Sequence, residues 1–155
     1  MGGTLRIRRM AEADAETVAT LAGELGYPNG VEMIRPRVRA IGEADLLLVA
    51  VDASDKAVGF IQAHRVCIIE VGFRVEILGL VVSSSARRSG IGQRLIEEAE
   101  RWAKRIGAEV VSVRSNTKRI EAHTFYPALG YKKIKTQALY KRRYDSAVFQ
   151  LPAIR

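Results

Sequence analysis

Apolar residues recur along this chain at two spacings, and each spacing predicts a kind of element. In residues 4–9, Leu5 and Ile7 alternate with arginines, which is the pattern of a strand with one buried face. In residues 91–106, apolar side chains return at helical spacing, which indicates a helix with one buried stripe. These patterns predict strands at 4–9, 46–51, 57–64, 74–82 and 109–114, helices at 11–25, 31–41, 91–106 and 117–129, and two further short strands within 131–144.

The order of these elements predicts the fold class. A strand, a helix and a strand follow one another between Val75 and Arg114, and such a unit forms a parallel pair through a right-handed crossover. The strands in the middle of the chain follow one another directly and should pair antiparallel. We therefore expect an α/β (α+β) fold whose mixed, mostly antiparallel sheet has about seven strands flanked by about four helices. Residues 1–155 should form a single domain, because this length suffices for one core.

Composition narrows the classes of partner and compartment. The chain has 25 Lys and Arg against 17 Asp and Glu, a formal charge of +8, which favours anionic ligands. Cys67 is the only cysteine, so an internal disulfide is excluded, and its apolar neighbours predict a packed thiol. No stretch approaches the roughly 18 apolar residues of a membrane helix, and residues 1–4 lead straight into charged residues. We expect a soluble, cytoplasmic protein without a membrane partner.

A basic, glycine-bearing turn separates the strand at 74–82 from the helix at 91–106. Its sequence is Arg87-Arg88-Ser89-Gly90-Ile91-Gly92. Glycines let a backbone approach a ligand closely, and the first turn of a helix offers free N–H groups and a partial positive charge. The turn therefore predicts a cradle for an anion such as phosphate, although a tight connection between two elements could have the same sequence.

This turn and the residues around it resemble the GNAT superfamily of N-acetyltransferases, which bind acetyl-CoA. Arg87-x-x-Gly90-x-Gly92 matches the family's (Gln/Arg)-x-x-Gly-x-(Gly/Ala) motif, and residues 80–82 match the strand that leads into it. Further matches are Asn116 after a strand and Ala122-His123-x-Phe125-Tyr126-x-x-Leu129-Gly130-Tyr131, which resembles the family's closing helix. The resemblance runs from about Leu5 to Arg143, with specific motifs between about 75 and 131.

The resemblance implies acetyl-CoA as co-substrate and no metal. The pyrophosphate would lie on the turn and helix start, formed by Arg87, Arg88, Ser89, Gly90, Ile91, Gly92 and Gln93. The pantetheine arm would pair with the strand at Leu80, Val81 and Val82, where a bulge involving Gly79, Leu80 or Val81 could supply an N–H to the oxyanion. Asn116 could hold a cofactor amide or cap the strand end.

Two residues are candidates for the proton transfers that the implied reaction needs. An amine acceptor is mostly protonated at neutral pH, and the resemblance places the base at Glu76. The alternative for Glu76 is an exposed strand residue facing Arg65 or Arg74. Tyr126 occupies the position of the family's acid, which returns a proton to the CoA thiolate; the alternative is a packed aromatic. Pro127 is expected to push Tyr126 away from helical dihedrals.

The acceptor is the least defined part of this prediction. Tyr27 lies in the region where family members build the acceptor wall, so Tyr27 and Glu76 are the candidates for substrate binding. We expect transfer of an acetyl group to a primary amine of a small molecule. The alternatives are a protein lysine or N-terminus, and a CoA-binding interaction module without turnover. His64 and His123 have no metal-ligand spacing and read as structural. We interpret the basic residues at the end of the chain as a solvated strand face, so nucleic acid is not the expected partner. A homodimer is compatible with the sequence.

Overall fold

A computed structural model describes residues 4–144 of this chain. The contacts divide it into two compact units, Met1–Val113 and Arg114–Arg155, which are described separately. The first unit holds the sheet and three of the helices, and the second holds one short helix. Among the helices within 4–144, none is both long and apolar enough to cross a membrane.

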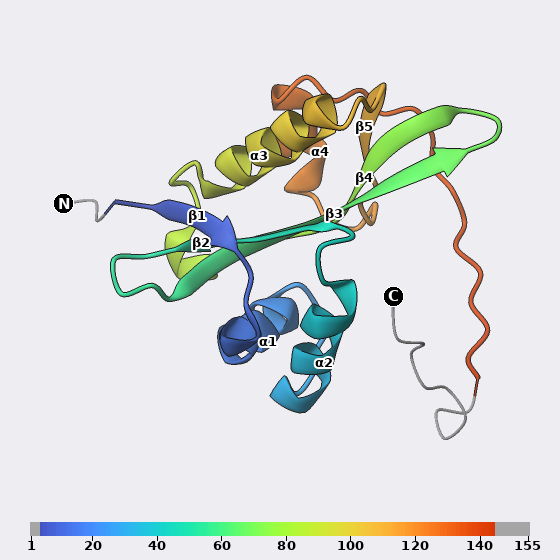
Figure 1. Ribbon diagram of the computed structural model, residues 1–155. Helices are drawn as coiled ribbons and strands as arrows, with labels where there is room; N and C mark the ends of the chain where they lie inside the picture. Colours follow the sequence, from blue (N-terminus) through green and yellow to red (C-terminus); the bar gives the residue numbers. More distant parts are fainter. Residues whose placement is uncertain (1–3, 145–155) are drawn as a thin grey trace. The chain divides into compact units, whose positions relative to one another are not determined.

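The first unit is built on a mixed sheet of five strands in the order β1-β2-β3-β4-β5 (Figure 1). Neighbours from β1 to β4 pair antiparallel, and β4 pairs parallel with β5. The predicted parallel pair and antiparallel hairpins are therefore confirmed. The strands are β1 (Arg6–Arg9), β2 (Leu46–Val51), β3 (Ala57–Ile68), β4 (Gly72–Val82) and β5 (Val110–Val113).

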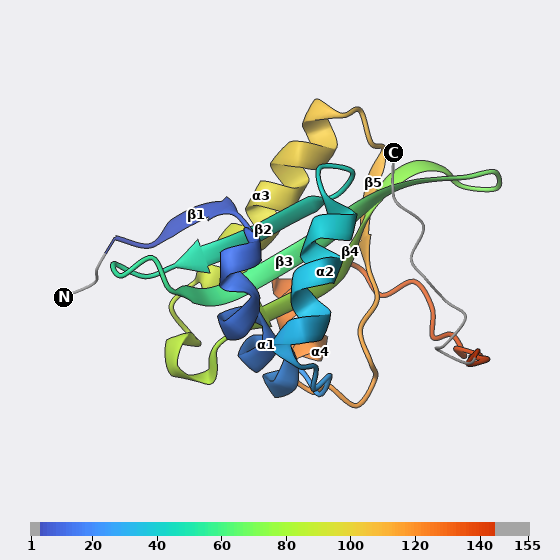
Figure 2. The same ribbon diagram turned by 60° about the horizontal axis from the view of Figure 1, so that its bottom comes forward.

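Helices cover both faces of this sheet. Helices α1 (Ala15–Glu24) and α2 (Val31–Ile41) lie on one face, and α3 (Ile91–Arg105) lies on the other (Figures 1 and 2). The predicted helices within this unit are confirmed, with short 3-10 turns at Glu12–Asp14 and Ser84–Ala86. The core on the α1 and α2 face includes Val18, Leu21, Ile34, Leu47, Val49, Val51 and Val81. On the other face, α3 buries Leu95, Ile96 and Ala99 completely.

A buried ion pair ties β1 to the start of α1. The Arg8 guanidinium donates from Nη1 and Nη2 to the two oxygens of Asp14, both at 2.9 Å, and the Ala11 N–H donates to Asp14 Oδ2 at 2.7 Å. Asp14 is 7% exposed, so its charge needs these partners. Burial raises the pKa of the Asp14 carboxyl, but the hydrogen bonds from Arg8 and Ala11 outweigh it, and the pKa is lowered overall.

The hairpin of β3 and β4 is longer than the sequence pattern predicts. The strands were expected to span 57–64 and 74–82, but they continue to Ile68 and begin at Gly72, joined by a tight turn. The tip extends past β2, which pairs with β3 only as far as Ala63 (Figure 1). Cys67 is exposed there, so the prediction of a packed thiol was wrong: its apolar neighbours form a projecting hairpin.

The second unit contains α4 (Ala122–Ala128), shorter than the helix expected over 117–129 because turns precede it. The two strands expected within 131–144 are absent from this described segment, so the sheet has five strands and the prediction of about seven was wrong. A strand needs a hydrogen-bonded neighbour and usually one buried face. Ile134, Leu139 and Tyr140 are instead 84–90% exposed, so alternation alone did not produce a sheet.

Candidate functional site

The turn before α3 has the backbone geometry of an anion cradle. Gly90 is the residue that precedes the first turn of α3, and its φ of +80° lies in the left-handed region that favours glycine. Arg88 shares this region with a φ of +64°, which is uncommon for a side-chain-bearing residue. A Cβ built on Gly90 would meet nothing within 4 Å, so the side on which it would lie is open. Glycine at this position therefore permits the left-handed backbone conformation and leaves space for a ligand.

The N–H groups of this turn are available to a ligand. Helix α3 has no side-chain cap, and no N–H from Arg87 to Gln93 donates a hydrogen bond within residues 4–144. Ser89 Oγ donates to the Ala86 carbonyl at 2.5 Å, which fixes the turn without using those N–H groups. Unpaired N–H groups at a helix start bind phosphate well. A pyrophosphate therefore fits the residues present, with Arg87 and Arg88 adding positive charge.

Strand β4 offers an open edge beside the cradle. Gln62 pairs with Gly79 and Ala63 pairs with Ile77, so Leu78 is an extra residue that forms a bulge in β4. β5 pairs only with residues 74–77 of β4, so from Leu78 to Val82 no strand of the described chain pairs on that side.

The hydrogen bond from Ser83 N–H to the Val58 carbonyl, 2.8 Å long, shows which groups face that edge. In an antiparallel pair the backbone groups alternate in direction, so Ser83, Val81 and Gly79 point toward β3. Leu80 and Val82 then point toward the open edge. The Val82 carbonyl accepts a long hydrogen bond from Arg87 Nε, at 3.4 Å, which joins the strand to the turn. An amide-bearing arm could pair with this edge as an added strand.

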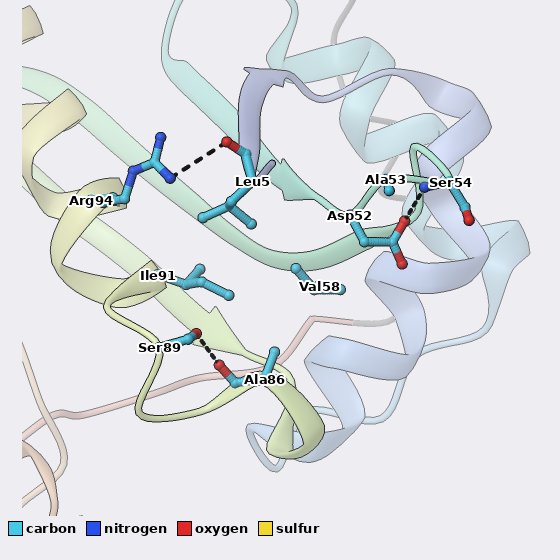
Figure 3. A pocket seen from close by; sticks show the side chains of 9 residues that line it. All are labelled: Leu5, Asp52, Ala53, Ser54, Val58, Ala86, Ser89, Ile91 and Arg94. Carbon is cyan, nitrogen blue, oxygen red and sulfur yellow. Dashed lines mark hydrogen bonds between the residues drawn. The ribbon is translucent and has the colours of Figure 1, made fainter. Parts of the chain in front are cut away.

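A shallow pocket of about 520 Å³ adjoins the other side of the cradle (Figure 3). Ser89, Ile91 and Arg94 form its wall on the α3 side, while Leu5 and the β2–β3 turn close it opposite. Arg94 donates to the Leu5 carbonyl at 3.4 Å, and Asp52 accepts from the Ser54 and Lys56 N–H groups of its own turn. The polar groups of this pocket are therefore partly engaged in holding the loops around it.

Glu76 lies on the sheet face that α1 and α2 cover. Its neighbours Val75 and Ile77 are buried on the opposite face, and Glu76 itself is half-buried. The register places Glu76 opposite His64 of β3 and beside Ser112 of β5. Arg65, expected as one partner of Glu76, pairs with Val75 and belongs to the other face, whereas Arg74 shares the face of Glu76.

A carboxylate and a histidine beside Glu76 were not recognised as a pair from the sequence. His64 Nδ1 and Asp45 Oδ1 lie 2.5 Å apart, and the Gln62 amide nitrogen lies 3.5 Å from Asp45 Oδ2. Asp45 comes just before β2, where the register continues opposite His64. The alternation of side chains along β3 places Gln62 and His64 on one face. To recognise Asp45 as their partner, one must also know how β2 pairs with β3. Within residues 4–144, no cluster of three or more His, Cys, Asp or Glu suits a metal ion.

Tyr126 belongs to the second unit and lies within α4. The expectation that Pro127 pushes Tyr126 out of helical conformation was wrong, because α4 runs through both residues. The Tyr126 ring makes edge-to-face contacts with Phe125 and Tyr131, at 5.1 and 5.9 Å between centroids. Burial raises the pKa of the Tyr126 phenol above its ordinary value of 10.0, and the nearby Arg119 charge opposes this only in part. The phenol therefore keeps its proton at neutral pH.

Three further candidates have local hydrogen bonds to neighbouring residues. Asn116 Oδ1 accepts from the Lys118 N–H at 3.0 Å, so its side chain caps a local turn and leaves its amide nitrogen for other contacts. His123 Nε2 lies 2.9 Å from the Thr117 carbonyl, as a structural histidine would. Tyr27 follows α1 and is 62% exposed, and its carbonyl accepts from the Asn29 amide at 2.9 Å.

Comparisons with known proteins match the part of the chain that contains β4, the cradle and α4. The family model described as "Acetyltransferase (GNAT) domain" matches residues 43–133, more than half of the chain. An aminoalkylphosphonate N-acetyltransferase of Salmonella typhimurium (strain LT2) is 43% identical over 58 residues. That match covers 37% of this chain and 38% of the relative, so the chain spans well under half of the relative's length.

Solved structures share the fold over most of the chain. The aminoglycoside N-acetyltransferase AAC(6')-Iy in complex with CoA has a TM-score of 0.80 at 20% identity, covering 93% of this chain and 98% of that one. A structure described as a transcriptional regulator from Bacillus halodurans C-125 has a TM-score of 0.77 at 27% identity, covering 90% and 100%.

Proposed function

This chain belongs to the GNAT acetyltransferase domain family, and we propose that it transfers the acetyl group of acetyl-CoA to a primary amine of a small molecule. We further propose that residues 1–155 act as one N-acetyltransferase domain, because the family match at 43–133 runs across the boundary between the two units. The elements of the cradle and of the open β4 edge all lie within the first unit.

The observation that carries this proposal is that two hydrogen-bonding surfaces adjoin each other. The N–H groups from Arg87 to Gln93 and the edge groups of Leu80 and Val82 meet where β4 turns into α3. One surface suits a pyrophosphate and the other suits the amides of a pantetheine arm. CoA carries both groups in this order, and Asn116 is proposed as a further contact to its amides.

The proton transfers are proposed for Glu76 and Tyr126. Glu76 would accept a proton from the acceptor ammonium, which leaves the nitrogen lone pair free to attack the acetyl carbonyl. The Leu78 bulge redirects the strand that follows it, which makes the Leu80 N–H, on the open edge, the candidate to stabilise the oxyanion, whereas the N–H groups of Gly79 and Val81 point toward β3. Tyr126 would return a proton to the departing thiolate, and its protonated state at neutral pH supports that role. Tyr27 is proposed to contact the acceptor.

A small amine acceptor is favoured by the aminoalkylphosphonate N-acetyltransferase, which shares 43% identity over the matched segment. The exposed α2 arginines Arg35 and Arg37 would also suit an acceptor that carries an anionic group. A peptide acceptor would use the same chemistry. The likeness to a structure described as a transcriptional regulator supports one alternative of another class, a CoA-binding interaction module without turnover.

Thermal melting with acetyl-CoA tests the cofactor first. At about 100 times its Kd the ligand should stabilise the fold by about 2.7 kcal/mol and raise Tm by several degrees. CoA release is then measured with an aminoalkylphosphonate, a polyamine and a lysine peptide as acceptors. Turnover with either small amine supports the proposal. Turnover with the peptide alone would show that the acceptor is a peptide rather than a small molecule. A Tm shift without turnover supports the interaction module, and no shift at millimolar acetyl-CoA rejects the cofactor.

A further inference from the structure

The Asp45–His64 pair lies on the same sheet face as Glu76. Asp45 is 12% exposed in its side chain, whereas the His64 side chain is 46% exposed. A carboxylate that is this buried needs a donor, and His64 Nδ1 at 2.5 Å is in position to be one. When Nδ1 carries the proton toward Asp45, the other ring nitrogen, Nε2, keeps a lone pair and can accept a proton.

The sheet register aligns this pair with Glu76 in one row. Asp45 precedes β2 opposite His64 of β3, His64 is opposite Glu76 of β4, and Glu76 is beside Ser112 of β5. Directly opposite residues of an antiparallel pair point to the same face with Cβ atoms roughly 5 Å apart. The imidazole is thus a proton acceptor directly across the strand from Glu76, and its exposed side opens to water.

We propose that His64, held by Asp45, relays to solvent the proton that Glu76 takes from the acceptor. This inference rests on the proposed function. The acceptor ammonium gives one proton to the Glu76 carboxylate, Glu76 gives it to His64 Nε2, and the imidazolium gives it to water. Each step moves one proton and restores the carboxylate for the next turnover. In this scheme His64 and Asp45 are positioning and relay residues, since the base that touches the substrate is Glu76.

The charges around His64 are consistent with this path. Asp45 faces it from the start of β2, and Glu76 faces it from β4. Arg74 lies two residues before Glu76 on the same face, and its Nε is buried without a hydrogen-bond partner among residues 4–144. Two carboxylates and one guanidinium therefore lie around the imidazole on this face of the sheet. In the described chain, no ion pair joins His64 to α1 or α2.

The relay is tested by comparing His64→Asn, Asp45→Asn and a matched control, Arg65→Gln. Arg65 is the next residue of β3 and is exposed on the opposite face, so its replacement should leave kcat/KM unchanged. kcat/KM is measured across pH with the acceptor that gives the highest wild-type turnover among the three named above. His64→Asn and Asp45→Asn should each lower it roughly tenfold at about pH 6.5. The loss should shrink toward about pH 9, because free amine becomes more abundant and a base is needed less.

A structural role for the pair predicts a different result. It would give a loss that does not depend on pH, together with a lower Tm, and imidazole added to a His64→Gly variant would not restore turnover. The relay predicts partial rescue by imidazole, since the site is open to solvent. Equal kcat/KM for His64→Asn and wild type at every pH, with an active wild type, would overturn the relay and leave the proposed function standing. A wild type that binds acetyl-CoA without any turnover would overturn the catalytic proposal, and the relay with it.

A measurement on the unmodified chain covers the case in which the variants do not fold. The chain has two histidines, so the ¹⁵N signals of His64 are assigned by comparison with a His123→Gln variant. The neutral His64 ring should carry its proton on Nδ1, which faces Asp45. A proton on Nε2 would leave no lone pair facing away from Asp45 and would overturn the relay.

Discussion

Replacing Gly90 by alanine separates the backbone strain of the cradle from its contact with a ligand. Gly90 has a φ of +80°, and a Cβ there would meet nothing within 4 Å. The cost to folding is therefore backbone strain alone, roughly 1–2 kcal/mol for an L-residue in the left-handed region. For a chain of this size that corresponds to a Tm lower by about 2–8 °C.

The same substitution should weaken acetyl-CoA binding by more than this strain explains. The added methyl would stand where the anion approaches the N–H groups of α3, and a hydrogen bond to a charged group contributes about 1.5–3 kcal/mol. Loss of one such bond would raise Kd roughly 10- to 100-fold. Tm is measured by thermal melting, and Kd is measured by calorimetric titration with acetyl-CoA.

Gly107 provides the matched control. It follows the other end of α3 with a φ of +78°, and a Cβ there also meets nothing within 4 Å. Gly107→Ala should lower Tm as much as Gly90→Ala while leaving Kd unchanged. Equal Kd values for Gly90→Ala and wild type would refute the cradle as the phosphate site. An equal loss of affinity in both variants would show that strain in α3, rather than contact at Gly90, controls binding.

Other substitutions test the proposed chemistry and the buried ion pair. Glu76→Gln should lower kcat roughly 100-fold near pH 7 while keeping the Tm shift with acetyl-CoA, and wild-type turnover in this variant would remove the role of Glu76 as base. Tyr126→Phe should likewise lower kcat about 100-fold. Because burial raises the Tyr126 pKa, the wild-type rate should not fall from loss of this proton until the pH exceeds about 10, and an earlier fall abolished by Tyr126→Phe would contradict that. Asp14→Asn should cost about 1.5–3 kcal/mol of unfolding free energy at pH 7 in urea denaturation, because it removes the buried carboxylate to which Arg8 donates two hydrogen bonds and leaves Arg8 with the exposed Asp55. Since the Asp14 pKa is lowered, the stabilisation that Asp14 gives is present above the unfolded value near 3.9 and is lost as pH falls through the folded value. Asp55 is the exposed partner of Arg8, so Asp55→Asn is the matched control and should destabilise the fold much less than Asp14→Asn.

Local sequence signals predicted the parts of the fold whose causes are local. A glycine before an amphipathic run marks a helix start, so the turn at Gly90 and the bounds of α3 followed from the residues themselves. The parallel pairing of β4 with β5 followed from the crossover helix between them. The open edge of Leu80 and Val82 was expected only from the family resemblance, because it depends on where β5 stops.

The parts that were wrong or missed depend on distant partners. Residues 131–144 alternate like strands, yet none of their apolar side chains is buried and no ladder forms in the described segment. The Asp45–His64 pair depends on two strand registers and on a hairpin turn placed at residues 69–71 rather than after His64. A single sequence carries no direct record of register, so Asp45 could not be aligned with Glu76 in advance.

Cys67 gives the chain one chemically addressable position. It is the only cysteine, and it is exposed on the projecting part of the β3–β4 hairpin, opposite Phe73. From Phe73 to Val82 the strand advances about 3.3 Å per residue, so the thiol lies roughly 30 Å along the sheet from the cradle. A maleimide dye would therefore label each molecule once, far enough from the cradle to report on a fluorescent CoA analogue by energy transfer. The same thiol would add one fixed equivalent per chain to any assay that counts released CoA with a thiol reagent, and Cys67→Ser removes it.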